Sequence, residues 1–242
     1  MILALIITIG ITFVLAAIIH IDPTGDMVIQ IIFTAISVIA MIPAIYIGNK
    51  LLFKIPFSTQ VAPIRQWNWG IYIKAFIITL AFYGVMISIQ LFTTGLAFPK
   101  NLPIAIFLLF LILPLFQGFA EEFAFRGLFM QTFGSWFKIP IVAIVFQAVL
   151  FSVLHRYPLL ALISVICTGV LYGFIVWYSQ GLEVSSAMHA VNNIFSFLAI
   201  GFGLQQGTSG NSPDVLFTNL VLLAIPIIIV LVLDKKFGFL KA

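Results

Sequence analysis

The sequence predicts an all-α protein: a polytopic transmembrane helical bundle that forms a single integral membrane domain over residues 1–242. Composition is the first reason, because hydrophobic residues make up 63% of the chain and charged residues 7%, whereas soluble domains carry about 25% charged residues. The second reason is that apolar runs such as 104–116 continue without interruption, whereas a transmembrane strand alternates apolar and polar residues. Backbone polar groups in lipid are satisfied only in helices and closed barrels. These observations exclude a soluble enzyme, a nucleic-acid-binding domain and a disordered chain.

The apolar segments predict about eight spans, because a helix needs about 20 apolar residues to cross a bilayer. The candidates are residues 1–19, 27–48, 71–92, 103–131, 139–156, 159–179, 182–203 and 214–233. With this count, most Lys and Arg residues fall on one side of the membrane when the N-terminus is cytoplasmic. Because cytoplasmic loops are enriched in Lys and Arg, we expect the N- and C-termini to be cytoplasmic. The polar connection 49–70 is expected to lie along the inner interface.

Three charged residues fall inside the fourth span, where each ionisable group costs about 2.5–3.5 kcal/mol near mid-bilayer. Glu122 and Arg126 are four residues apart, a helical spacing that suits an ion pair. Glu121 projects about 100° away from Glu122 on a helical wheel, so it faces a different environment. A buried ion pair that only fixes helix packing explains Glu122 and Arg126, but it leaves Glu121 unexplained.

Two of the three histidines lie in later apolar segments and share a helix face with a second residue. Phe151 precedes His155 by four residues, and His189 precedes Asn193 by four residues. Polar groups left without partners in lipid are costly, so we expect these side chains and the glutamates to meet in the bundle interior.

Such a cluster suits the hydrolysis of a peptide bond without a covalent intermediate. A glutamate and a histidine can hold and deprotonate a water molecule, while a second histidine and an asparagine amide can stabilise a developing oxyanion. Two imidazoles and a carboxylate can instead bind zinc. The residues alone leave both possibilities open.

The motifs EExxxR, FxxxH and HxxxN occur in this order on separate apolar segments, and together they resemble the CPBP family of intramembrane proteases. This family comprises the CAAX proteases and bacteriocin-processing enzymes and is also called the Abi family. The residues that carry the resemblance are Glu121, Glu122, Arg126, Phe151, His155, His189 and Asn193. The resemblance spans the motif-bearing protease core, residues 103–203.

The resemblance implies a role for each of these residues. Glu121 would be the catalytic base, His155 would help to activate the water, and His189 and Asn193 would support the oxyanion. The supporting residues would be Glu122, Arg126 and Phe151. If a metal such as Zn²⁺ is bound, its ligands would be Glu121, His155 and His189, although we favour a metal-free mechanism.

The expected function is therefore that of an intramembrane endopeptidase acting on a membrane-bound protein or peptide. The reaction would serve CAAX-type processing, peptide maturation or bacteriocin self-immunity, in contact with the lipid bilayer and with no nucleic acid. A non-catalytic membrane scaffold or immunity factor is the main alternative, and a proton-coupled transporter is another. We expect a multi-pass protein of a prokaryotic plasma membrane, and the sequence does not indicate its oligomeric state.

Overall fold

The fold is known from a computed structural model, in which the described residues form helices, turns and connecting segments without any strand. The described ranges are 26–52, 54–95, 101–155, 157–204 and 212–240. The expected first span, residues 1–19, lies outside them. Within these ranges, the predicted all-α membrane fold is confirmed.

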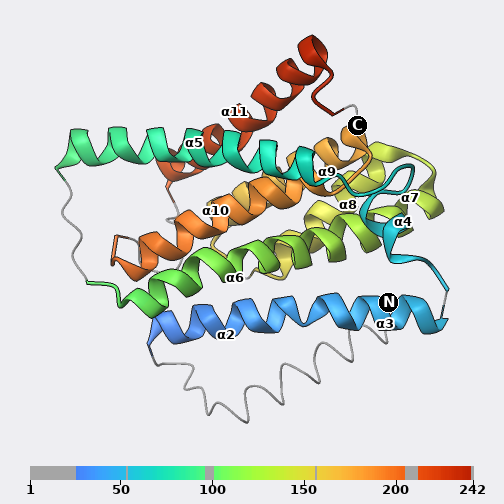
Figure 1. Ribbon diagram of the computed structural model, residues 1–242, viewed down its shortest axis with the longest axis horizontal. Coiled ribbons are helices and arrows are strands. Elements are labelled where there is room, and N and C mark those ends of the chain that lie inside the picture. The colour runs from blue at the N-terminus through green and yellow to red at the C-terminus, as the bar shows by residue number, and fades with distance from the viewer. Residues whose placement is uncertain (1–25, 53, 96–100, 156, 205–211, 241–242) are drawn as a thin grey trace.

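The helices lie largely side by side along the long axis of the molecule, and α11 crosses the others at an angle (Figure 1). They are α2 (Met27–Ile39), α3 (Met41–Leu52), α4 (Phe57–Val61), α5 (Trp69–Thr94), α6 (Ile104–Glu122), η1 (Phe123–Met130), α7 (Gln131–Phe137), α8 (Pro140–Val153), α9 (Leu159–Ser179), α10 (Glu183–Gly201) and α11 (Pro213–Phe237). Helix α10 packs against α5, α6 and α9, while α8 packs on α9 and α2 on α6.

Five helical segments in the described part of the chain are long and apolar enough to cross a membrane. They are Met27–Leu51, Trp69–Thr93, Ile104–Phe137, Leu159–Ser179 and Pro213–Phe237. The expected span 139–156 appears as the shorter apolar helix α8. These segments make the chain an integral membrane protein, while the number of eight spans and the orientation of the termini stay predictions.

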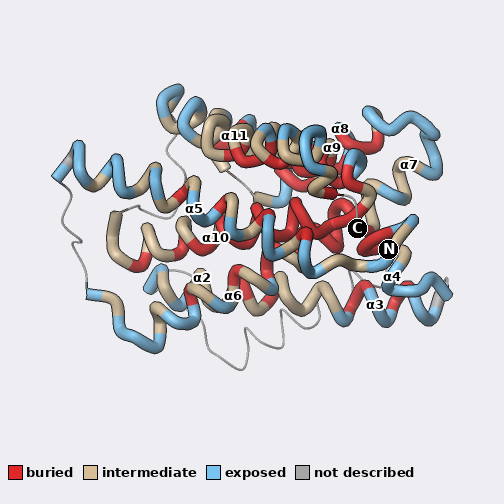
Figure 2. Tube along the Cα trace, turned by 45° about the horizontal axis from the view of Figure 1, so that its top comes forward, coloured by how far each residue is buried: buried red, intermediate tan, exposed pale blue. Residues whose placement is uncertain are grey.

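Helix α10 is the most polar of the long helices and lies in the interior of the bundle. Most of its N-terminal half is buried, including Glu183, Ser185, Ser186 and His189, and Figure 2 shows buried residues concentrated along α10 and the neighbouring helices. Polar side chains are unfavourable in contact with lipid, so the surrounding apolar helices shield α10. This arrangement brings one predicted motif to the centre of the protein.

The polar connection 49–70 packs against the start of α10, with part of its length buried. The Val61 carbonyl accepts a hydrogen bond of 2.9 Å from the Leu182 amide. Arg65 donates to the Glu183 carboxylate at 2.5 and 2.8 Å, and Glu183 is fully buried. This connection therefore fixes the end of α10 that precedes the predicted histidine.

Candidate active site

The helix that contains both glutamates changes its winding directly after them. Helix α6 ends at Glu122, and the π-helical segment η1 follows over Phe123–Met130. The expected span 103–131 lies within the apolar helical segment Ile104–Phe137 to within a residue, but the winding changes from α to π at residue 123. A π-helix has a wider turn and is often found at functional sites, so the residues after Glu122 face directions that an α-helical wheel does not give.

The predicted ion pair forms and is fully buried. Arg126 Nη1 donates to Glu122 Oε1 at 2.9 Å, and neither side chain is exposed. Arg126 Nη2 donates to the Gly169 carbonyl on α9 at 3.3 Å. The guanidinium also lies over the Phe151 ring at 4.8 Å and the Tyr172 ring at 5.6 Å, in cation–π contact. Phe151 thus supports the site by holding Arg126.

His189 lies between the two glutamates and links them. Its Nδ1 is 2.8 Å from Glu122 Oε1, and its Nε2 is 3.5 Å from Glu121 Oε2. Because the Glu122 carboxylate is held by Arg126 and accepts, Nδ1 bears the hydrogen of the first contact. The second contact is a close approach without a hydrogen bond. His189 is therefore bonded to Glu122 and lies beside Glu121.

Gln117, one turn before Glu121 on α6, leaves the two oxygens of Glu121 in different environments. Gln117 Nε2 donates to Glu121 Oε1 at 3.2 Å. Glu121 Oε2 is buried and accepts no hydrogen bond from the described residues. Oε2 is consequently the oxygen available to a proton from elsewhere.

His155 follows the end of α8, and its ring is oriented by the backbone. Its Nδ1 is 2.7 Å from the Phe151 carbonyl oxygen. Since a carbonyl only accepts, Nδ1 bears the hydrogen and the neutral ring has its lone pair on Nε2. The Phe151 ring lies 4.5 Å from the His155 ring and 6.0 Å from the His189 ring. Phe151 thus separates the two histidines while touching both.

Asn193 is half-buried one turn after His189, and its described contact lies outside the cluster. Its Oδ1 accepts from Asn192 Nδ2 at 3.4 Å, and Asn192 in turn accepts from the Tyr83 hydroxyl at 2.9 Å. Within the described part of the chain, no hydrogen bond joins Asn193 to Glu121 or the histidines. Its expected role at the oxyanion stays a prediction.

Tyr157, in the connection between α8 and α9, is a site residue that sequence reasoning missed. Its half-buried ring lies 5.5 Å from the His155 ring. Burial raises the pKa of the Tyr157 hydroxyl, and the negative charge of Glu121 raises it further. The phenol therefore stays protonated at neutral pH. Its position two residues after His155 was the available signal.

The cluster does not present a three-ligand metal site. Among the described residues, no three His, Cys, Asp or Glu side chains are grouped so that they could hold a metal ion. Both nitrogens of His189 face carboxylates, and one nitrogen of His155 faces a carbonyl. The expected set of Glu121, His155 and His189 does not fit zinc as arranged, so no step below passes through a metal.

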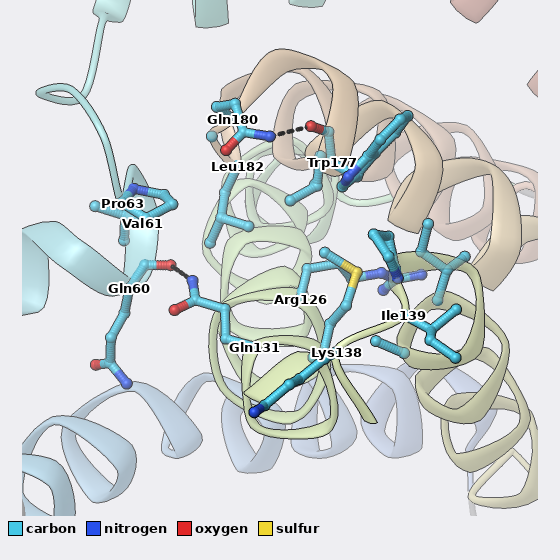
Figure 3. A pocket seen from close by; sticks show the side chains of 17 residues that line it. Gln60, Val61, Pro63, Arg126, Gln131, Lys138, Ile139, Trp177, Gln180 and Leu182 are labelled. Atoms are coloured by element: carbon cyan, nitrogen blue, oxygen red, sulfur yellow. Dashed lines mark hydrogen bonds between the residues drawn. The ribbon is translucent and has the colours of Figure 1, made fainter. Parts of the chain in front are cut away.

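A cavity of about 280 Å³ approaches Arg126 from the end of the bundle where α7 meets α8. Arg126 and Lys138 line it, and Figure 3 shows the Gln131 side chain bonded to the Gln60 carbonyl at its edge. Neither the Glu121 carboxylate nor the two histidines line this cavity. Arg126 thus has the cavity on one side and the Glu122–His189 pair on the other.

The segment that contains the cluster is similar to a known family of membrane proteases. Residues 103–195 match the type II CAAX prenyl endopeptidase Rce1-like model, which belongs to the CPBP family. The chain is also 28% identical over 186 residues to the "Uncharacterized protein YyaK" of Bacillus subtilis, with 71% of this chain covered. It spans 61% of the length of that relative. No solved structure matches the chain.

Proposed function

Because residues 103–195 match the Rce1-like model, we propose that this protein is an intramembrane endopeptidase. It hydrolyses a peptide bond in a membrane-embedded or lipidated protein or peptide, in the manner of CAAX processing. The observation that carries the proposal is the close approach of Glu121 and His189, 3.5 Å apart, in a cluster buried among apolar helices. A cluster that served packing alone would have no need of this second carboxylate.

Glu121 is the base in this proposal. The Glu122 carboxylate accepts from both Arg126 and His189, so it is already committed. Glu121 is the other carboxylate, and its Oε2, which has no hydrogen-bond partner among the described residues, can accept a proton from water. Proton transfer to a positioned base contributes about 10²–10⁴-fold to such a rate.

His155 helps to hold the water. Its Nδ1–H donates to the Phe151 carbonyl, so the lone pair on Nε2 accepts one hydrogen of the water while Glu121 takes the other. The water oxygen then attacks the carbonyl carbon of the substrate. When the C–N bond breaks, the proton on Glu121 passes to the departing amine, and the site returns to its starting state.

The substrate side of the proposal rests on the family. The Rce1-like match covers the segment with the cluster. Because this model describes type II CAAX prenyl endopeptidases, a lipidated C-terminal segment is the first substrate class to test. Peptide maturation and bacteriocin self-immunity are the further roles within this proposal. The Bacillus relative supports a prokaryotic plasma membrane as the location.

A comparison of newly formed protein termini in cells tests the function. Membranes from cells that make the wild type or Glu121→Gln, at equal protein levels, are compared by terminus-selective mass spectrometry. We expect a set of termini that only the wild type produces, because the amide retains the shape of Glu121 but accepts no proton. Identical sets would reject the endopeptidase.

The same termini test the metal-free mechanism. Isolated wild-type membranes are incubated with a zinc chelator, and termini formation is followed before and after zinc is returned. We expect no change. Loss of cleavage that zinc restores would replace the water activation described above with a metal-dependent one.

A further inference from the structure

Asn193 ends a chain of three polar side chains that joins α5 to α10. The Tyr83 hydroxyl on α5 donates to Asn192 Oδ1 at 2.9 Å, and Asn192 Nδ2 donates to Asn193 Oδ1 at 3.4 Å. Tyr83 is buried, and the two asparagines are half-buried. In the described part of the chain, no hydrogen bond joins these three side chains to the glutamates or the histidines, so they form a network separate from the charged cluster.

The direction of this network is fixed at its buried end. A buried phenol O–H without an acceptor is costly, and Asn192 Oδ1 is the acceptor that Tyr83 has among the described residues. A reversed network would turn the Asn192 amide nitrogen toward Tyr83 and leave the phenol hydrogen without an acceptor. Asn192 therefore keeps its oxygen toward Tyr83 and its nitrogen toward Asn193. This orients Asn193 in turn, because only the oxygen of its amide accepts from Asn192 Nδ2.

The same network leaves the Asn193 amide nitrogen unused. An asparagine amide has two N–H donors, and Asn193 Nδ2 makes no hydrogen bond with the described residues. Asn193 follows His189 by four residues on α10, so their β-carbons lie on one face, about 5–6 Å apart. His189 Nε2 in turn lies 3.5 Å from Glu121 Oε2. The unused donors are therefore one helical turn from the histidine beside the proposed base.

An amide donor at this place helps hydrolysis only if it faces the substrate with its nitrogen. Attack of water on a peptide carbonyl places negative charge on the carbonyl oxygen, and positioned N–H donors stabilise that charge. The oxygen and nitrogen of a side-chain amide are almost equal in size, so rotation by 180° costs little sterically and would present the oxygen to the charge. A group that prevents this rotation therefore contributes to the rate without touching the substrate.

We propose that Tyr83 and Asn192 are positioning residues, which hold the Asn193 amide with its N–H groups toward the carbonyl oxygen of the scissile peptide bond. Their role rests on the proposed endopeptidase. As water loses a proton to Glu121 and its oxygen bonds to the carbonyl carbon, the carbonyl electron pair moves to the oxygen that Asn193 Nδ2 binds. That pair returns when the C–N bond breaks and Glu121 protonates the amine. No proton passes along the network.

The test is a double-mutant cycle that combines Tyr83→Phe with Asn193→Ala and measures kcat and KM separately. The full-length protein in nanodiscs receives a peptide with the sequence around a terminus lost in Glu121→Gln cells. We expect Asn193→Ala to lower kcat by about 10²–10³-fold, as for the loss of one oxyanion donor. Tyr83→Phe should lower kcat by about 10-fold, because misplacement of a reacting group costs up to about 10²-fold. KM should stay near the wild-type value in both variants.

The double variant separates positioning from packing. Asn193→Ala leaves no amide to direct, so the addition of Tyr83→Phe should then leave kcat unchanged, as expected for residues in one hydrogen-bond network. Phe retains the ring contact of Tyr83 with Phe195 at 5.2 Å, which keeps α5 packed on α10. If Tyr83→Phe lowers kcat by the same factor in both backgrounds, the phenol acts on packing and the positioning role is wrong.

Two further variants complete the test. Asn192→Ala removes the middle link of the network, so its kcat should fall as in Tyr83→Phe, and the combination of the two should cause no further loss. Tyr178→Phe is the matched control, because it also removes a tyrosine hydroxyl that donates to a side chain, Asp234, at 2.9 Å. Tyr178 is exposed and should be replaceable with full activity. A wild-type kcat in Asn192→Ala would overturn the proposal.

Failure of the endopeptidase itself has a different outcome. If Glu121→Gln cleaves the peptide as fast as wild type, or wild type cleaves no membrane peptide, the proposed function fails and the positioning role fails with it. If Glu121→Gln is inactive while Tyr83→Phe or Asn193→Ala cleaves at the wild-type rate, the positioning role alone is rejected.

Discussion

Two ion pairs with buried carboxylates lie in the described part of the chain, and they differ in how completely their polar atoms are hydrogen-bonded. Arg65 and Glu183 join the connection before α5 to the start of α10, while Glu122 and Arg126 lie within one continuous helical segment. Both carboxylates are fully buried. Burying an ion pair offers little net stability in itself, so the hydrogen bonds around each pair indicate what it does.

The Arg65–Glu183 pair has the features of a structural clasp. Glu183 accepts from both terminal nitrogens of Arg65 and from the Asn68 amide at 2.9 Å. Arg65 also donates to the Ser179 carbonyl at 3.3 Å. These bonds leave the carboxylate oxygens of Glu183 occupied by partners within the fold, and no group is left over for a substrate.

The Glu122–Arg126 pair is different, because it belongs to a network with open positions. Glu122 Oε1 accepts from Arg126 and His189, while Glu122 Oε2, Arg126 Nε and Glu121 Oε2 have no hydrogen-bond partner in the described part of the chain. Buried polar atoms without partners are costly, and they are tolerated where a ligand or water binds. Both ion pairs bury charge, so what separates the candidate active site from the Arg65–Glu183 pair is its incomplete hydrogen bonding.

Loss of Arg126 is the change with the largest expected effect on this comparison. Arg126→Ala leaves Glu122 charged and unpaired inside the bundle, so the free energy of unfolding should fall by about 3–5 kcal/mol. Glu122, which accepts from His189, is then no longer held in place by Arg126, so cleavage should be lost too. Denaturation of the purified protein in detergent and its activity measure the two effects.

A double variant sharpens this prediction. Glu122→Gln combined with Arg126→Met removes both charges, so it should recover much of the stability while remaining inactive, because the His189 Nδ1 partner is no longer anionic. If Arg126→Ala folds and cleaves like the wild type, the ion pair has neither role.

Loss of Arg65 should affect stability without affecting chemistry. Arg65→Ala leaves Glu183 buried and unpaired. Because the Arg65 side chain is 18% exposed, water reaches the vacated position, so the free energy of unfolding should fall by only about 3 kcal/mol. Activity per folded molecule should be retained. A large fall in kcat at full folding would mean that this clasp also sets the position of His189.

Much of the fold was predictable because lipid imposes simple requirements on a sequence. Apolar length predicted the span 159–179, which matches α9 in full, and predicted α2 with α3 and α5 to within a few residues. Glu183 lies at the start of the expected span 182–203 and is fully buried. Its pairing with Arg65 joins residues 118 apart, and no local pattern indicates such a contact.

Part of the site was predictable for a similar reason. The i,i+4 spacing correctly predicted the ion pair of Glu122 with Arg126, and polar residues in apolar segments correctly predicted that His189 would join it. The π-helical turn at η1 depends on tertiary packing and was not predictable. Tyr157 was missed because connections are usually polar and exposed, and tyrosine is common near membrane interfaces.

The smallest expected effect comes from Gly118, where α6 and α10 touch. A Cβ at this position would lie 2.8 Å from the Ala190 amide nitrogen and 3.2 Å from the His189 carbonyl carbon. Both are backbone atoms and cannot rotate away, so Gly118→Ala must separate the helices, at a cost of about 1–3 kcal/mol.

That separation acts on the Glu121–His189 contact but leaves Arg65–Glu183 intact, so kcat should fall more than stability does. Gly84→Ala on α5 is the matched control, because its Cβ would meet nothing within 4 Å, and replacing a helical glycine by alanine stabilises a helix by roughly 0.5–1 kcal/mol. Kinetics and detergent denaturation of both variants provide the measurement. If Gly118→Ala lost stability but kept its full kcat, the rate would not depend on the 3.5 Å contact between Glu121 and His189. The site would then tolerate a small displacement of α6 from α10 without loss of activity.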